Sequence, residues 1–102
     1  MTVWYKQGVI GDLQPVAQKG LGRVANAHKN NGRDTFVTSL REGNHSKGSL
    51  HYIGLAFDIQ PHLSVDVINI ALGSGWDVIN EGNHIHCEYD PKFERTTIGQ
   101  TI

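Results

Sequence analysis

Two short polar stretches constrain the fold more than any other feature of the chain. The first contains His51 and ends in Asp58, and the second contains Glu81, His84 and His86. Three nitrogen or oxygen ligands and a further carboxylate are the side chains of a catalytic zinc site, which keeps its fourth position open for water. We therefore expect the fold to bring the two stretches together.

The second stretch reads as a β-strand, in which alternate side chains share a face. His84 and His86 are then on one side of the strand, and Ile85 and Cys87 are on the other. A His-x-His pair on a strand is weak evidence for a metal by itself, and a glutamate in a turn, such as Glu81, is usually just solvated. The metal prediction therefore rests on the joint pattern.

The first stretch places its candidates in a loop and in the strand that follows. His51 falls in the loop and Asp58 in the strand. Gly54 gives the connection conformational freedom. Ala56 shares a face with Asp58 and is small, so it leaves space near an ion.

Hydrophobic periodicity and turn residues predict an α+β fold. The expected elements are strands at 2–5, 35–40, 55–59, 76–79 and 84–88, and helices at 13–31 and 65–72. The last two strands form a hairpin with its turn at 81–83. This order predicts a small, mostly antiparallel sheet with helices on one face and the zinc site in a cleft on the other.

The helix ends carry specific signals. Asp12 is the expected cap of the first helix, Pro15 suits its first turn, and Ser64 is the expected cap of the second. Gly20 and Gly22 lie in the middle of the first helix, where each costs roughly 1 kcal/mol relative to alanine. Either the helix bends there or another group packs closely against it.

Composition excludes several classes of protein. The 102 residues make one domain, 1–102, and the net charge of −1 argues against a nucleic-acid binder. No apolar run approaches a membrane span. The first residues lack the pattern of a signal peptide, so we expect cytoplasmic synthesis. Cys87 is the only cysteine and is expected to be a buried, inert thiol. The oligomeric state cannot be predicted from the sequence.

The first stretch resembles a known motif. The pattern Ser49-x-His51-x-x-Gly54-x-Ala56-x-Asp58 is similar to the complete first motif of the zinc D-Ala-D-Ala carboxypeptidases. That family includes vancomycin-resistance dipeptidases and phage endolysins that cleave peptidoglycan stem peptides.

A second resemblance concerns a relative of that family with a similar fold. Ser-Leu-His-Tyr at 49–52 and His-Ile-His-Cys at 84–87 resemble the zinc site of the Hedgehog signalling domain. The likeness runs from about 35 to 88, roughly half of the chain. The first motif is specific, and the second is moderately so.

Carried over by position, the resemblance implies that zinc is bound by His51, Asp58 and His86. His84 would lie beside the metal, where it could stabilise the transition state. Arg41 sits where family members often place an arginine that meets the substrate, and it could hold a substrate carboxylate by a bidentate contact.

Two assignments stay open. Many of these peptidases have Glu-x-x-His, with the histidine as ligand and the glutamate as base; Glu81 and His84 fit that spacing, whereas the Hedgehog-like alignment makes His86 the ligand. We favour His86 because the four-residue match is longer. Ser49 is a second candidate on the substrate side, as a donor that orients a ligand, or else it is a turn residue.

The resemblance therefore predicts hydrolysis of a peptide bond in peptidoglycan stem peptides, of the D-Ala-D-Ala carboxypeptidase or endopeptidase type, with Zn²⁺ as cofactor. It also implies that the protein acts on the cell wall after release from the cytoplasm. Glu81 would take the proton of the attacking water and deliver it to the leaving amine, and His84 is the second catalytic residue. The alternative is a catalytically silent, Hedgehog-like zinc-containing module that acts by binding a partner.

Overall fold

The computed structural model describes residues 3–9, 11–40 and 54–90. Within them the chain forms five strands and two helices. In chain order these are β1 (Val3–Tyr5), α1 (Pro15–Asn30), β2 (Thr35–Ser39), β3 (Ala56–Ile59), α2 (Val65–Leu72), β4 (Trp76–Asn80) and β5 (Ile85–Tyr89). The predicted α+β class is confirmed, and each expected element is present within a few residues of its expected bounds.

The strands form one mixed sheet in the order β1-β2-β3-β5-β4. The pairs β2–β3, β3–β5 and β4–β5 are antiparallel, and β1–β2 is parallel. The parallel pair arises because α1 lies between β1 and β2 in sequence and carries the chain back across the sheet, the connection that a parallel pair requires.

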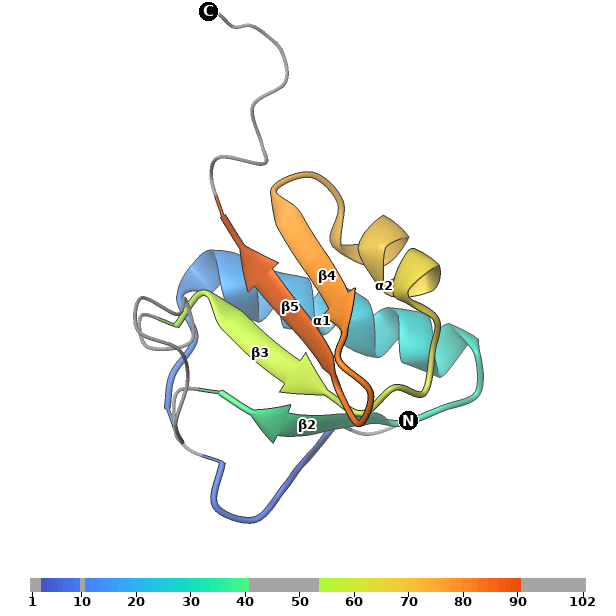
Figure 1. Cartoon of the computed structure of the whole chain (residues 1–102), viewed down its shortest axis with the longest axis horizontal. Helices are drawn as coiled ribbons and strands as arrows, with labels where there is room; N and C mark the ends of the chain where they lie inside the picture. Colours follow the sequence, from blue (N-terminus) through green and yellow to red (C-terminus); the bar gives the residue numbers. More distant parts are fainter. Residues whose placement is uncertain (1–2, 10, 41–53, 91–102) are drawn as a thin grey trace, which may run out of the picture.

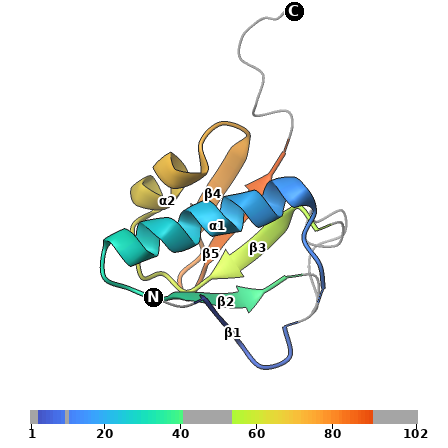
Figure 2. The same cartoon turned by 180° about the vertical axis from the view of Figure 1, so that it is seen from behind.

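Both helices cover the same face of the sheet. Figure 1 views the sheet with the helices behind it, and Figure 2 shows from the opposite side that α1 lies across the strands, with α2 beside it. The face towards the viewer in Figure 1 carries no helix and is called the open face below; the other is the covered face. The helices therefore lie where the sequence predicted them.

Strand alternation separates a buried core from the open face. Side chains on the covered face are shielded by the helices, and the fully buried apolar ones there are Val37, Phe57, Ile59, Ile85 and Cys87. The helices add Ala17, Leu21, Val24, Ile68 and Leu72 to the same cluster. Burial raises the pKa of the Cys87 thiol far above its usual range, so it stays protonated, in agreement with the prediction of an inert thiol.

The two helix N-termini differ in how they are capped. Ser64 caps α2 as predicted, since its Oγ accepts a hydrogen bond from the backbone N–H of Val67 at 3.3 Å. The prediction of Asp12 as the cap of α1 is wrong, because α1 begins at Pro15 and its N-cap is Gln14. The Gln14 N–H instead donates to the carbonyl oxygen of Gly54 at 2.9 Å.

His28 is a polar side chain in the apolar layer. Its late position in α1 suits a cation on dipole grounds, but the residue is fully buried. Its Nδ1 lies 2.8 Å from the carbonyl oxygen of Val24. Burial is the main reason why the pKa of His28 is lowered, with the charges of His62 and Arg33 acting in the same direction. The side chain is therefore neutral near pH 7.

Candidate metal and catalytic site

Strand pairing brings together one predicted ligand from each polar stretch. In the antiparallel β3–β5 ladder, Asp58 is directly opposite His86. Such pairs have Cβ atoms roughly 4.5–5.5 Å apart and share a face of the sheet. The Asp58 Oδ1 and His86 Nδ1 atoms accordingly lie 2.9 Å apart on the open face.

His86 lies between two carboxylates. Its Nε2 is 2.7 Å from Oε1 of Glu88, on the side away from Asp58. The hydrogen bond to Asp58 raises the pKa of His86 to about 9, and the bond to Glu88 adds to this, although burial opposes both. In the absence of a metal, His86 therefore carries a proton on each nitrogen near pH 7.

His84 and Glu81 form a second pair next to the first. His84 Nε2 lies 3.1 Å from Glu81 Oε1 and 3.9 Å from Asp58 Oδ2. The Asn83 side-chain oxygen lies 2.7 Å from His84 Nδ1 and fixes the other edge of the ring. The Glu81 side chain is 48% exposed, so it can meet both solvent and the histidine.

The local fold explains why these groups are held in place. The predicted turn between β4 and β5 is present, and the Glu81 N–H donates to the carbonyl oxygen of His84 at 2.9 Å across it. Gly82 has φ +97° there, a conformation that L side chains rarely adopt. In the first polar stretch, Gly54 precedes β3 and has φ +75°. An added Cβ there would lie 2.7 Å from the carbonyl oxygen of Asp12.

The donor chemistry at Asp58 and His86 fits zinc. Two atoms bound to one tetrahedral zinc ion at roughly 2.0–2.1 Å lie about 3.3 Å apart. The 2.9 Å between Asp58 Oδ1 and His86 Nδ1 is close to that value. Within residues 3–9, 11–40 and 54–90, no group of three or more His, Cys, Asp and Glu side chains is placed to hold an ion.

Three predicted site residues lie outside the described part of the chain. They are the third expected ligand, His51, and the two candidates for the substrate side, Arg41 and Ser49. The other four predicted residues, Asp58, Glu81, His84 and His86, are brought together on the open face.

A cleft opens on the sheet beside this cluster. It has a volume of about 480 Å³ and is lined by Lys6, Phe36, Thr38, Ser39, Asp58, Gln60, Asn83 and His84. This volume lies within the roughly 300–1,000 Å³ that is usual for small-ligand sites. Its lining extends from Asp58 and His84 across β2 to Lys6, which follows β1. A short chain molecule could therefore lie across the strands with one end next to the histidines.

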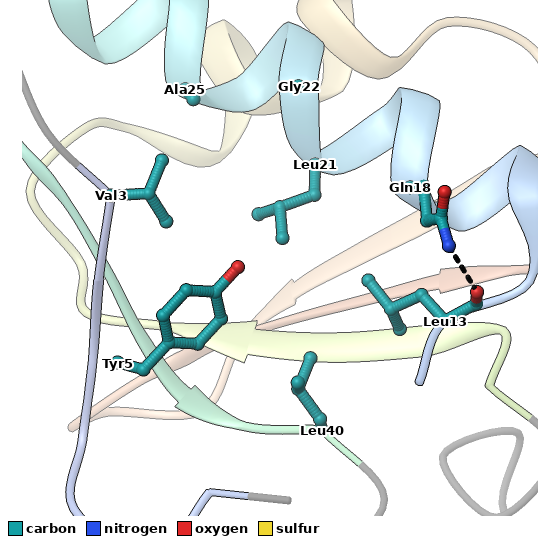
Figure 3. A pocket seen from close by; sticks show the side chains of 8 residues that line it. All are labelled: Val3, Tyr5, Leu13, Gln18, Leu21, Gly22, Ala25 and Leu40. Atoms are coloured by element: carbon teal, nitrogen blue, oxygen red, sulfur yellow. Dashed lines mark hydrogen bonds between the residues drawn. The ribbon is translucent and has the colours of Figure 1, made fainter. Parts of the chain in front are cut away.

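A second cavity lies on the covered side and has a different character. It measures about 410 Å³ and is bounded by β1, α1 and the end of β2. Figure 3 shows Tyr5 pointing into it towards Leu21, while the Gln18 side-chain N–H donates to the Leu13 carbonyl oxygen at 2.9 Å. The described residues that line this cavity include no carboxylate and no imidazole.

The sequence patterns did not predict a role in the site for Glu88 or for the cleft wall formed by Lys6 and Phe36. Glu88 could have been found, because a residue two positions after His86 on a strand shares its face. Lys6 and Phe36 could not, because their place beside Asp58 depends on the long-range pairing of β1 with β2 and β2 with β3.

No family model matches the sequence, and no curated protein shows a significant match to it.

Proposed function

We propose that the protein is a zinc-dependent peptidase that hydrolyses peptide bonds of bacterial peptidoglycan stem peptides, of the D-Ala-D-Ala carboxypeptidase or endopeptidase type. The observation that carries the proposal is the meeting of Asp58 and His86 at 2.9 Å, with His84 and Glu81 adjoining them at the end of a cleft. The motif in the first stretch adds His51 as the third ligand.

The cofactor supplies the part of the chemistry that side chains alone do poorly. A bound zinc ion polarises a scissile carbonyl and lowers the pKa of a coordinated water to about 7. Asp58 and His86 would hold it, together with His51. No residue of the described chain needs to act as a nucleophile.

Glu81 and His84 are the groups available for proton transfer. Glu81 is half exposed and hydrogen-bonded to His84, so it can take a proton from water and return it to the leaving amine. His84 lies between Glu81 and Asp58, where its N–H would stabilise charge that develops on the substrate oxygen.

The cleft favours a short, extended substrate over a folded protein. Its wall combines the Phe36 ring with the hydroxyl of Thr38, the amide of Gln60 and the ammonium group of Lys6. These groups suit a peptide with small side chains and polar or anionic ends.

Neither of the two helices in the described part of the chain has the length and the apolar character of a membrane span.

The test is to incubate soluble muropeptides with the zinc-loaded protein and with a chelator-treated sample, and to follow both by mass spectrometry. We expect a new fragment that disappears on chelation, and its mass identifies the bond that is cut. Glu81→Gln should lower the rate by about 10²–10⁴ while zinc stays bound. The matched control is Asp66→Asn, which removes an exposed carboxylate on α2 and should leave the rate unchanged.

A negative result separates the two functional classes. If the protein binds zinc but releases no fragment from a panel of stem peptides, the peptidase proposal fails. The result would then favour the Hedgehog-like binding module.

A further inference from the structure

Glu88 is a carboxylate that the proposed hydrolysis does not use. It lies on β5 two residues after His86, so both side chains are on the open face. Its Oε1 is 2.7 Å from His86 Nε2, and the two side chains are 25% and 14% exposed. A contact this short and this shielded from water is stronger than an ordinary surface ion pair.

The two nitrogens of His86 face different carboxylates. Nδ1 is 2.9 Å from Asp58, and Nε2 is 2.7 Å from Glu88. A histidine that binds a metal through one nitrogen keeps a proton on the other, and the partner of that proton decides which nitrogen is free. Asp58 is itself a predicted ligand, so the nitrogen that faces it is the one nearest to a shared ion.

We propose that Glu88 is a positioning residue of the metal site. It accepts the hydrogen bond from Nε2–H of His86, and this bond turns Nδ1 towards the ion that Asp58 also binds. The inference rests on the proposed function only in taking zinc as the ion. It adds the identity of the ligating nitrogen and a role for a residue outside the ligand set.

The chain offers a matched control on the neighbouring strand. Asp77 on β4 is directly opposite Glu88 in the β4–β5 ladder, so it lies on the same face. Removing Asp77 takes away a nearby negative charge without removing the partner of His86 Nε2. A role through charge alone predicts equal effects at the two positions, whereas a positioning role predicts an effect at Glu88 only.

The first measurement is the zinc dissociation constant, obtained by competition with a chromophoric chelator. Glu88→Ala should weaken zinc binding by about 10–100-fold, the usual effect of removing the hydrogen-bond partner of a metal-ligating histidine. Glu88→Gln keeps an acceptor oxygen and should lose less than Glu88→Ala. Asp77→Ala should change the constant by less than about fivefold.

The second measurement identifies the protonated nitrogen directly. Two-bond proton–nitrogen correlation spectra of ¹⁵N-labelled, zinc-loaded wild-type protein should show His86 with its proton on Nε2 and zinc on Nδ1. Glu88→Ala should make the Nε2 proton exchange faster with water. The wild-type spectrum decides the question even if the alanine variant fails to fold.

Three results would overturn the inference: zinc on Nε2 in the wild type, equal losses of affinity in Glu88→Ala and Asp77→Ala, or no zinc binding at all. The peptidase proposal fails separately. If zinc binds with the expected dependence on Glu88 but no stem peptide is cleaved, the positioning role stands and only the proposed reaction is lost.

Discussion

The two faces of the sheet use the same strands for different purposes. On the covered face, Phe57 pairs with Cys87 and both are fully buried in the apolar core. One residue further along the same ladder, Asp58 pairs with His86 on the open face. Because side chains alternate along a strand, the register that closes the core also sets the site. The site therefore takes its geometry from packing on the opposite side of the sheet.

The largest expected effect on stability tests whether the covered face and the open face differ in their contribution to folding. Phe57→Ala removes a fully buried ring and should lower the free energy of unfolding by about 3–5 kcal/mol. His84→Ala removes a side chain that is 30% exposed, and should cost less than about 1 kcal/mol. Urea unfolding of the chelator-treated proteins measures both free energies. Similar losses in the two variants would contradict the distinction between a stabilising covered face and a functional open face.

The stability of the zinc-free protein should depend on pH through His86 on the open face. In the zinc-free protein, the pKa of His86 is about 9, raised first by Asp58 and then by Glu88, whereas an unfolded histidine titrates near 6.5. The folded state then binds the extra proton more tightly, so this stabilisation is complete below about pH 6.5 and is lost as pH rises through 9. We expect the free energy of unfolding to fall by roughly 1–3 kcal/mol over this interval.

The buried histidine of α1, His28, has a pKa that is shifted in the opposite direction to that of His86. Burial lowers the pKa of His28, so its neutral form is favoured by folding, and stability from this group is lost as pH falls below about 6.5. His86→Gln should flatten the alkaline side of the stability profile and leave the acid side in place. An unchanged alkaline slope in that variant would show that another group is responsible.

Local patterns in the sequence predicted one half of the site better than the other. The alternation of His84, Ile85, His86 and Cys87 placed the histidines on one face and the core residues on the other, as observed, because period-two alternation is a property of the strand alone. The pairing of Asp58 with His86 joins residues far apart in the sequence. The motif suggested that they meet, but only the β3–β5 register shows which atoms face each other.

The wrong or missing predictions have tertiary causes. Asp12 is a good cap by residue type, but the contact between Gln14 and Gly54 moves the start of α1 past it. His28 suits a helix C-terminus by its charge, but the packing of α1 on the sheet buries it and makes it neutral. Lys6 joins the cleft because a parallel strand pair brings the segment after β1 alongside β2.

Two glycines of α1 have surroundings that differ. A Cβ on Gly20 would overlap the Trp76 ring, whereas a Cβ on Gly22 meets nothing within 4 Å. The Trp76 ring cannot easily move, since it is buried and packs against the tilted ring of Phe57 and edge-to-face with Tyr89, at centroid distances of 5.6 and 5.7 Å. Close packing against the Trp76 ring therefore explains the glycine at position 20, one of the two explanations that the sequence left open. The glycine at position 22 has no such contact and only lowers the helix propensity.

Alanine substitutions separate these two reasons for a glycine. Gly22→Ala should raise the free energy of unfolding by about 0.5–1 kcal/mol, because it restores helix propensity beside open space. Gly20→Ala gains the same propensity but overpacks the core, for a net loss of about 1–3 kcal/mol. Calorimetry resolves both, since 1 kcal/mol shifts the Tm of a domain of this size by roughly 4–8 °C. Equal rises in Tm would mean that the Trp76 ring moves aside, and that the covered face is less tightly packed than its geometry indicates.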